Sequence, residues 1–479
     1  MYYLGLDFGT SGVRAIVIDE QEEILLTLKT ENQKYETADD WQKALYFLLE
    51  QIPVEITSKL NKIAIDGTSS TVLLCDRNGE VRTEPLWYND DQGKKYLSQL
   101  ETILPKNHYC LSATSSLAKL YYWYQEKIWQ PEHYLLHQGD WIGSCLHGQL
   151  GISDYHNALK LGYDLLELKY PQWLLDQPFA KSLPRIKTPG GAIAPVTGEI
   201  SAKFNINPNC IVCGGTTDSI AAFLASGVKT VGEAVTSIGS TLVLKLLSDR
   251  KIDDIRYGVY SHKLGDLWLV GGASNTGGAV LRHYFDDRQL EQLSTQINID
   301  RPTNFHYYPL LKKGDRFPIN DPNLQPKLTP KPDDSVIFLQ GLLEGIAEIE
   351  AQGYRLLNEL GANPLTKVYT AGGGAKMGKN TYICTFYVVI FYVSYPTFLT
   401  CVHAMARKSF LTDPRLPKND LAMVCGRNCC WPWPCGSDFV LLKLLVAALR
   451  LLRLDTGDSE SMSRSIEWLT QQYEDNADR

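Results

Sequence analysis

Short polar turns between strand-like runs hold the residues best suited to phosphate chemistry. The first turn, residues 9–12, lies between a strand that carries Asp7 and a second strand that carries Arg14. Such a turn of Gly, Thr, Ser and Gly presents backbone N–H groups and hydroxyls in one concavity, which suits a polyphosphate tail. Asp7 could hold Mg²⁺ through an oxygen or a water, and Arg14 could add positive charge. The alternative is an ordinary hairpin whose aspartate accepts hydrogen bonds from nearby amides.

A second turn of the same kind lies about half a chain further on. Residues 234–246 again form a strand pattern, a turn and a strand pattern, with Gly239 and Ser240 in the turn. Two more glycine-rich runs, 271–278 and 372–376, each follow a strand-like run. Glycine lets the backbone approach a flat or anionic ligand closely. Any one of these runs could be an ordinary turn, but all of them together favour a nucleotide site.

Residues 214–219 form the junction between a strand-like run and an apolar helical run. The carboxylate of Asp218 could accept the proton of a substrate hydroxyl as that hydroxyl attacks phosphorus. Thr217 or Asp218 would also make a good helix N-cap, and the segment alone favours the cap. Residues 63–70, which include Asp66 and Ser69, form another strand that ends in short polar side chains. These side chains could bind a polyol by hydrogen bonds, or form a plain turn.

The turns also predict the fold class. A dinucleotide-binding unit has its glycine-rich turn before a helix, whereas both turns here lead into β-branched strand residues. The Gly-Lys-Ser/Thr ending of a P-loop does not occur in the sequence. Two similar hairpins half a chain apart therefore predict two related α/β domains that face each other, with a boundary near 195–210. Helical patterns cover 41–51, 116–127 and 344–360, and the proline-rich stretch 319–334 predicts a loop.

Composition narrows the class of protein. The 479 residues are 44% apolar and 21% charged, which predicts about two or three globular domains. A net charge of −7 without a basic run argues against nucleic acid as a partner. The first 376 residues contain cysteines without paired spacing, which predicts the reduced thiols of a cytoplasmic protein. The first residues form a strand-like run rather than a targeting segment, which agrees with that expectation.

The last hundred residues have a different composition. The uncharged stretch 382–402 is long enough for a membrane span, but its tyrosines, threonines and Pro396 favour buried strands or a non-native tail. Cysteines crowd into this part of the chain. Their gaps lack the paired C-x₂-C units of a zinc site. We therefore expect neither a membrane span nor a zinc ion there.

The ordered motifs resemble the FGGY family of carbohydrate kinases over about residues 2–376. The landmarks that carry the resemblance are, in order, residues 7–11, 66–69, 140–141, 154–158, 214–218, 237–241, 272–278 and 371–376. The resemblance implies an α/β fold of two actin/hexokinase-type (ribonuclease H-like) domains with the active site in the cleft between them. It implies a sugar-side domain over 1–200, a nucleotide-side domain over 201–376 and an atypical segment over 377–479.

The resemblance also implies ATP and Mg²⁺, with phosphate passed to a hydroxyl of a free sugar. It assigns Asp218 as catalytic base, Asp7 to the metal and the sugar, and Ser69 and Asp218 to the sugar. The residues that it assigns to ATP are Thr10, Ser11, Gly12, Arg14, Gly239, Ser240, Gly277, Gly373 and Gly374.

Within the family, residues 157–163 and 257–262 are most similar to D-ribulose kinases of the cyanobacterial and plant type. This implies D-ribulose as substrate, with D-xylulose or another polyol as the alternative. After Lys376 the family pattern ends, because Met377 stands where an asparagine is expected and Asn380 where a tryptophan is expected. The rival hypothesis is therefore a catalytically impaired relative that binds sugar or nucleotide. An ATPase without a sugar acceptor is a third.

Overall fold

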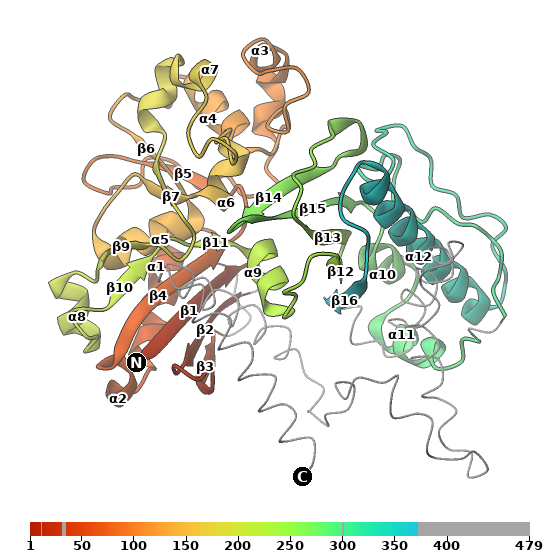
Figure 1. The fold of residues 1–479 in the computed structure, drawn as a ribbon, viewed down its shortest axis with the longest axis horizontal. Coiled ribbons are helices and arrows are strands. Elements are labelled where there is room, and N and C mark those ends of the chain that lie inside the picture. The colour runs from red at the N-terminus through yellow and green to blue at the C-terminus, as the bar shows by residue number, and fades with distance from the viewer. Residues whose placement is uncertain (11, 31–34, 299–300, 372–479) are drawn as a thin grey trace.

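The computed structural model describes residues 1–10, 12–30, 35–298 and 301–371 (Figure 1). Two mixed sheets lie side by side, with helix α9 (Asp218–Ala225) between them in this view. The first sheet has the strand order β3-β2-β1-β4-β10-β9, with β11 beside β4. The second has the order β14-β15-β13-β12-β16. An α/β fold with two sheets is what the repeated hairpin pattern predicts.

Strands of the first sheet come from the first half of the chain. They are β1 (Tyr2–Gly9), β2 (Gly12–Ile18), β3 (Ile24–Lys29), β4 (Leu60–Gly67), β9 (Ala192–Pro195), β10 (Ile211–Cys213) and β11 (Thr216–Thr217). The second sheet contains β12 (Glu233–Ile238), β13 (Leu242–Ser248), β14 (Tyr260–Leu264), β15 (Leu267–Ser274) and β16 (Lys367–Ala371). Two small sheets pair β5 (Val72–Cys75) with β6 (Tyr134–His137), and β7 (Ile152–Asp154) with β8 (Arg185–Lys187).

Both large sheets repeat one pairing pattern. In the first, β1 pairs antiparallel with β2 and parallel with β4, and β2 pairs antiparallel with β3. In the second, β12 pairs antiparallel with β13 and parallel with β16, and β13 pairs antiparallel with β15. Helix α1 (Ala38–Glu50) precedes β4, and helix α12 (Ser335–Glu359) precedes β16 in the same way. This repeat confirms the expectation of two related α/β halves.

The remaining helices fill the space around these sheets. They are α2 (Val54–Thr57), α3 (Leu97–Glu101), α4 (Ser116–Gln125), α5 (Gln138–His147), α6 (Tyr155–Ala158), α7 (Gln172–Leu175), α8 (Gly198–Phe204), α10 (Gly278–Tyr284) and α11 (Asp287–Ser294). Short 3₁₀ turns are η1 (Gln92–Tyr96), η2 (Leu159–Leu161), η3 (Pro178–Ser182) and η4 (Ile255–Tyr257). None of the helices within the described ranges is long and apolar enough to cross a membrane.

Helix ends follow the capping residues. Thr37 caps α1 by a capping box with Asp40, so the helix starts before the expected residue 41. The predicted helix 344–360 starts at Ser335 instead, because Asp334 accepts hydrogen bonds from the first backbone N–H groups of α12. Its apolar side chains continue at helical spacing through this extra stretch, for example at Phe338 and Leu342. The prediction of that helix start was therefore wrong by nine residues, 344 against 335.

The first half of the chain meets the second half at the start of α9. Strands β10 and β11 pair with β4, so the first sheet continues past the expected boundary at residue 200 as far as Thr217. Helix α9 then packs on the second sheet, where Ile220 and Phe223 join a buried cluster with Leu247 and Leu269. The strand pairing thus favours a division after Thr217.

Several expectations concern residues outside the described ranges. These are the glycines at 373 and 374, Ser11, the uncharged stretch 382–402, the late cysteines and the whole of 377–479. The five cysteines that the structure does describe form no disulfide, and all but Cys145 are buried. Reduced buried thiols were the expectation for these positions.

Candidate active site

Two carboxylates lie side by side where the first sheet faces the second half. Asp7 on β1 is opposite Arg14 on β2, and its other neighbour in the sheet is Asp66 on β4. Nη1 of Arg14 donates to Oδ2 of Asp7 over 2.9 Å. Asp7 is 2% exposed, and burial raises its pKa against the opposing effect of Arg14. Arg14 therefore pairs with the predicted metal ligand, and its contact with the phosphates stays a prediction.

Asp66 is the more isolated carboxyl group of this pair. Its side chain is fully buried, and neither oxygen receives a hydrogen bond from a donor in the part of the chain that the structure describes. Burial raises the pKa of Asp66 well above its usual value, and the charges of Asp7 and Asp218 raise it further. A protonated Asp66 can donate a hydrogen bond to Asp7, whereas two ionised carboxylates could not form this bond.

Asp218 is the first residue of α9, directly after β11. Its Oδ1 accepts from the backbone N–H of Ser219 over 2.6 Å. Burial raises the pKa of Asp218 to about 6, with a smaller contribution from the charge of Asp7. Unlike Asp7 and Asp66, the residue keeps some exposure. A carboxyl group that titrates near neutrality and reaches solvent can accept a proton from a bound hydroxyl.

The helix-capping alternative for this segment is weaker in the structure. Thr217 occupies the N-cap position of α9, but its side chain makes no capping hydrogen bond. Its Oγ1 is buried and has no hydrogen-bond partner among residues placed by the structure. A buried hydroxyl without a partner costs free energy unless a ligand or water satisfies it. The unpaired group beside Asp218 therefore favours a ligand site over a purely structural cap.

A cationic group lies opposite these carboxylates, and the sequence reasoning missed it. Lys245 on β13 and Tyr260 on β14 lie on either side of Gly271 on β15. Because Gly271 has no side chain, the ammonium and the ring can approach each other across it. The Nζ of Lys160 lies 3.6 Å from the centre of the Tyr260 ring and lowers the pKa of that phenol to about 8.

Lys245 also acts on the predicted base. Its positive charge opposes the rise in the pKa of Asp218. The Nζ of Lys245 lies 3.4 Å from Nδ1 of His262, and burial lowers the pKa of both groups. The signal that could have identified Lys245 is its place inside the apolar run 242–247, where a charged residue is unusual in a buried strand.

The predicted nucleotide residues of the second half form one connected pair of loops. The backbone N–H of Gly278 donates to the carbonyl oxygen of Gly239 over 2.8 Å, and that of Ala279 to Ser240 over 3.1 Å. Gly277 has a φ of 134°, and a Cβ there would lie 2.8 Å from the carbonyl carbon of Thr241. Only glycine allows this close approach without strain. The loops therefore need Gly277, and Ser240 is left exposed between them.

The first hairpin has the turn that the sequence predicts. Gly9 and Gly12 are the closing pair of β1 and β2, and Thr10 is exposed at the tip. In the turn after the neighbouring strand β4, Ser69 is the one residue of 63–76 that is not buried. A turn that exposes a single hydroxyl while its neighbours are buried suits the predicted contact with a polyol.

His156 is a satisfied core histidine. Its Nδ1 lies 2.7 Å from Oγ1 of Thr216 in the first sheet, and its Nε2 lies 2.7 Å from the carbonyl oxygen of Lys263 on β14. The ring therefore connects the two halves of the chain. Burial lowers its pKa to about 4, so it is neutral at physiological pH.

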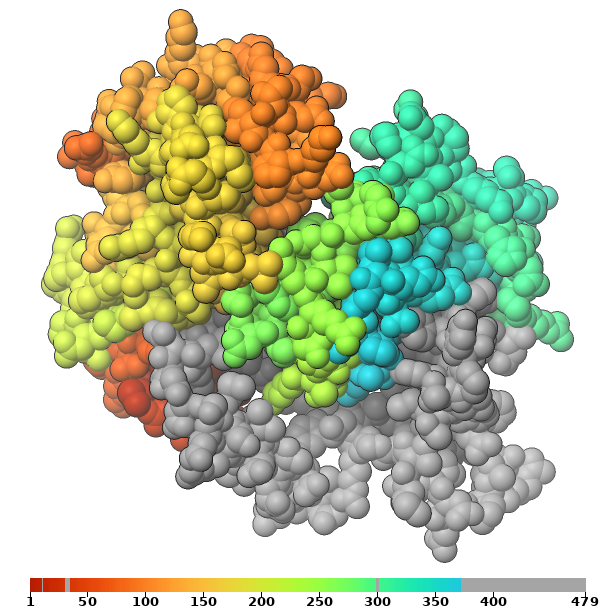
Figure 2. All heavy atoms as spheres, turned by 45° about the horizontal axis from the view of Figure 1, so that its top comes forward, coloured from red at the N-terminus to blue at the C-terminus, as the bar shows by residue number. Residues whose placement is uncertain are grey.

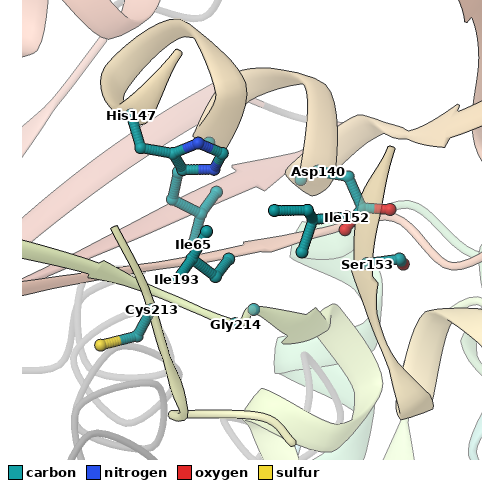
Figure 3. Close-up of a pocket in the computed structure, with 11 residues that line it drawn as sticks. Ile65, Asp140, His147, Ile152, Ser153, Ile193, Cys213 and Gly214 are labelled. Carbon is teal, nitrogen blue, oxygen red and sulfur yellow. The ribbon is translucent and has the colours of Figure 1, made fainter. Parts of the chain in front are cut away.

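A small pocket lies on the other side of β4 (Figure 3). His147 and Asp140 from α5 line it together with Ile65 and Cys213. None of the predicted site residues lines this pocket. On the surface, Figure 2 shows a notch between the orange part of the first half and the green part of the second.

The carboxylates fit the magnesium ion that the site predicts. The described residues contain no cluster of three or more histidine, cysteine or acidic side chains that could hold a metal by themselves. Magnesium in kinases uses one or two carboxylates and completes its shell with substrate phosphates and waters. Asp7 supplies such a carboxylate, and the unpaired oxygens of Asp66 lie next to it. The donor set thus suits a metal shared with a nucleotide.

Comparison with known proteins agrees with this geometry. A solved xyloylose kinase from Brucella ovis superposes with a TM-score of 0.72 at 21% identity, over 80% of this chain and 84% of that one. The paired sheets therefore have the two-domain fold of the actin/hexokinase type. Residues 2–225 match the N-terminal domain of the FGGY family of carbohydrate kinases. Over these residues the chain is similar to that family of carbohydrate kinases.

Curated relatives cover most of the chain at low identity. A xylulose kinase of Staphylococcus epidermidis is 20% identical over 402 residues, which are 78% of this chain and 80% of the relative. A gluconokinase of Bacillus subtilis is 20% identical over 424 residues, again 78% of this chain and 80% of the relative. The names of these relatives differ in the sugar, so they support the family and the reaction class rather than one substrate.

Proposed function

We propose that the chain transfers the terminal phosphoryl group of ATP to a hydroxyl of a free ketopentose, D-ribulose, to give D-ribulose 5-phosphate. The observation that carries this proposal is Asp218. It lies where the two halves meet, keeps some exposure, and has a pKa of about 6 because it is buried beside Asp7. Most of this carboxyl group is ionised at neutral pH, yet it remains basic enough to accept a proton.

In the proposed step one proton is transferred, one bond to phosphorus forms and one breaks. The sugar hydroxyl donates its proton to Asp218 as its oxygen attacks the terminal phosphorus, and the bond from that phosphorus to the oxygen of ADP breaks. Ser69 hydrogen-bonds the sugar and fixes the angle of attack. Asp7, held by Arg14, would bind Mg²⁺, which neutralises charge on the phosphates. Phosphoryl transfer depends mainly on the positions and charges of the groups around the phosphate. The proposed step therefore relies on the arrangement of these side chains and needs no covalent intermediate.

ATP is expected against the second half. Gly239, Ser240 and Gly277 form the connected loops that would approach its phosphates, and Thr10 and Gly12 would face them from the first hairpin. Thr276 supports this assignment, because its buried Oγ1 has no hydrogen-bond partner within the described ranges. The other residues that we assign to ATP are Ser11, Gly373 and Gly374, which lie outside the described residues.

D-ribulose rests on the sequence runs 157–163 and 257–262, and D-xylulose on the names of the relatives. An ADP-release assay with D-ribulose, D-xylulose, L-ribulose, gluconate and glycerol separates these substrates. We expect the highest kcat/KM with D-ribulose, and a loss of about 10²–10⁴-fold in Asp218→Ala. ADP release that does not depend on sugar, or equal activity in the variant, would contradict the proposal.

A second candidate is a relative that binds sugar or nucleotide without efficient turnover. The sequence after Lys376 favours it, because Met377 and Asn380 depart from the family pattern there. Calorimetric titration with ATP and with D-ribulose tests this candidate directly. Binding of both ligands without measurable product would replace the kinase proposal by this one.

A further inference from the structure

The turn that carries Ser69 has an unusual backbone. Ser70, the next residue, has a φ of 65°, in the left-handed region that residues with a Cβ seldom adopt. Such a conformation persists only where neighbouring groups fix it. Two anchors hold the turn, one at each end.

Gln138 is the first anchor. Its Oε1 accepts from the backbone N–H of Thr68 and from the Oγ1 of the same residue, both over 2.9 Å. Gln138 lies at the start of α5, so this anchor joins the turn to a helix that packs on β4. The contact fixes the residue before Ser69 but not the residue after it.

Lys119 on α4 is the second anchor. Its side chain is fully buried, and its Nζ donates to the carbonyl oxygen of Ser70 over 2.8 Å. The same Nζ also donates to the carbonyl oxygen of Trp87. One ammonium group therefore ties the turn after β4 to the segment around Trp87. The neighbouring Tyr88 adds a third link, because its backbone N–H donates to Oγ1 of Thr71 over 3.0 Å.

This arrangement is poor for stability alone. The Nζ of Lys119 has two neutral carbonyl partners, and no carboxylate within the described ranges lies at salt-bridge distance from it. Burial lowers its pKa to about 7, which shows that its surroundings disfavour the charge. A buried charge without an ionic partner costs free energy, and the two hydrogen bonds to carbonyl oxygens offset part of that cost. What these bonds add beyond stability is a fixed position for the two carbonyl groups.

We propose that Lys119 is a positioning residue of the sugar site, which holds the Ser70 carbonyl and thereby sets the direction of the Ser69 hydroxyl. The inference rests on the proposed function, since it takes Ser69 as a sugar contact. Lys119 does not touch the sugar. It acts through the backbone of the turn, at the end that Gln138 leaves free.

The test compares Lys119→Met and Lys119→Arg with the wild type and with Lys95→Met. Lys95 is an exposed lysine of the neighbouring η1 that pairs with Glu126, so its loss controls for removal of a positive charge nearby. We expect Lys119→Met to raise KM for the sugar by about tenfold, the change that loss of one hydrogen bond from a charged group gives. KM for ATP should stay close to that of the wild type, whereas the melting temperature should fall by a few degrees because two carbonyl oxygens lose their donor. Lys119→Arg should recover part of the loss, and Lys95→Met should change neither constant.

Equal changes in both KM values, or a lower melting temperature with an unchanged KM for the sugar, would overturn the assignment. Lys119→Gln serves as a second variant if the methionine variant does not fold, and the same rise in KM for the sugar is expected for it. Calorimetric binding of the sugar accompanies the kinetics. A wild type that binds sugar without phosphorylating it would contradict the proposed function alone, and the affinities of the variants would still test Lys119. A wild type that binds no pentose would overturn both.

Discussion

Replacement of Asp218 by asparagine separates what this carboxyl group does for catalysis from what it does to stability. Asparagine keeps an oxygen that can accept the N–H of Ser219, so the start of α9 should be preserved. It removes the charge that, in the proposed function, accepts the proton of the sugar hydroxyl. We expect kcat to fall by about 10²–10⁴-fold, the usual contribution of a general base.

The same substitution should stabilise the chain at neutral and higher pH. The folded state raises the pKa of Asp218 from 3.8 to about 6, so ionisation is harder in the folded than in the unfolded chain. The contribution of Asp218 to the free energy of unfolding is complete below pH 3.8 and is lost as the pH rises through about 6. The difference corresponds to about 3 kcal/mol at most, and to about 1–2 kcal/mol once solvent screening of this partly exposed group is allowed for.

Thermal unfolding without ligands measures this effect. At about pH 8 the asparagine variant should melt a few degrees above the wild type, and the difference should shrink towards about pH 4. Asp333→Asn, an exposed carboxylate in a loop, is the matched control and should change neither property. The kcat/KM of the wild type should fall about tenfold per pH unit below pH 6.

Two results would refute this reasoning. One is an asparagine variant that keeps activity within about a factor of ten of the wild type, which would show that another group takes the proton. The other is a variant that melts below the wild type at about pH 8, which would show that the charge of Asp218 is stabilised in the folded chain.

Three further predictions follow from buried contacts. Gly277→Ala should raise KM for ATP by more than about tenfold, because the Cβ of the alanine would lie 2.8 Å from the carbonyl carbon of Thr241. Titration with nucleotide measures this change, and an unchanged affinity would contradict the prediction. Glu350→Gln should raise the melting temperature most at and above about pH 7, and the difference should shrink to nothing towards pH 4.5, because burial raises the pKa of Glu350 from 4.5 to about 7. A pH-independent effect in the melting curves would refute the role of that charge. Asp7→Asn should weaken activation by Mg²⁺, so that half-maximal ADP release needs a higher Mg²⁺ concentration. Chelation of Mg²⁺ should stop ADP release by the wild type.

Local patterns in the sequence were sufficient to predict the strands that carry the site. Around Asp7 and Ser240, apolar and β-branched runs lie on either side of a short Gly/Ser/Thr turn, which predicts a strand, a tight turn and a second strand, and the structure has them there. The junction before Asp218 could be found because glycines and small polar residues interrupt two apolar runs. The fold class followed from the repetition of the first hairpin in the second half.

Contacts between distant segments could not be predicted in the same way. Lys160 and Tyr260 lie 100 residues apart in the chain and meet only because η2 and the edge strand β14 come together. The position of Lys119 under the turn of Ser70 depends on how α4 packs against β5 and β6, which no local pattern encodes. The sequence did not predict that Arg14 pairs with Asp7, although both residues lie in the first hairpin. The direction of an arginine side chain depends on the charged groups that surround it in the folded chain.

The abrupt change of partner at Asp218 has a consequence for the timing of the reaction. Thr217, the residue before it, is hydrogen-bonded into the first sheet, and α9, which it begins, packs on the second. Asp218, the proposed base, thus lies at the joint between the two halves, and a change in the angle between them must turn the peptide that carries it. A sugar that draws the halves together would also align its own base. Without the sugar, the same joint would leave the carboxylate misdirected, which would protect ATP from water.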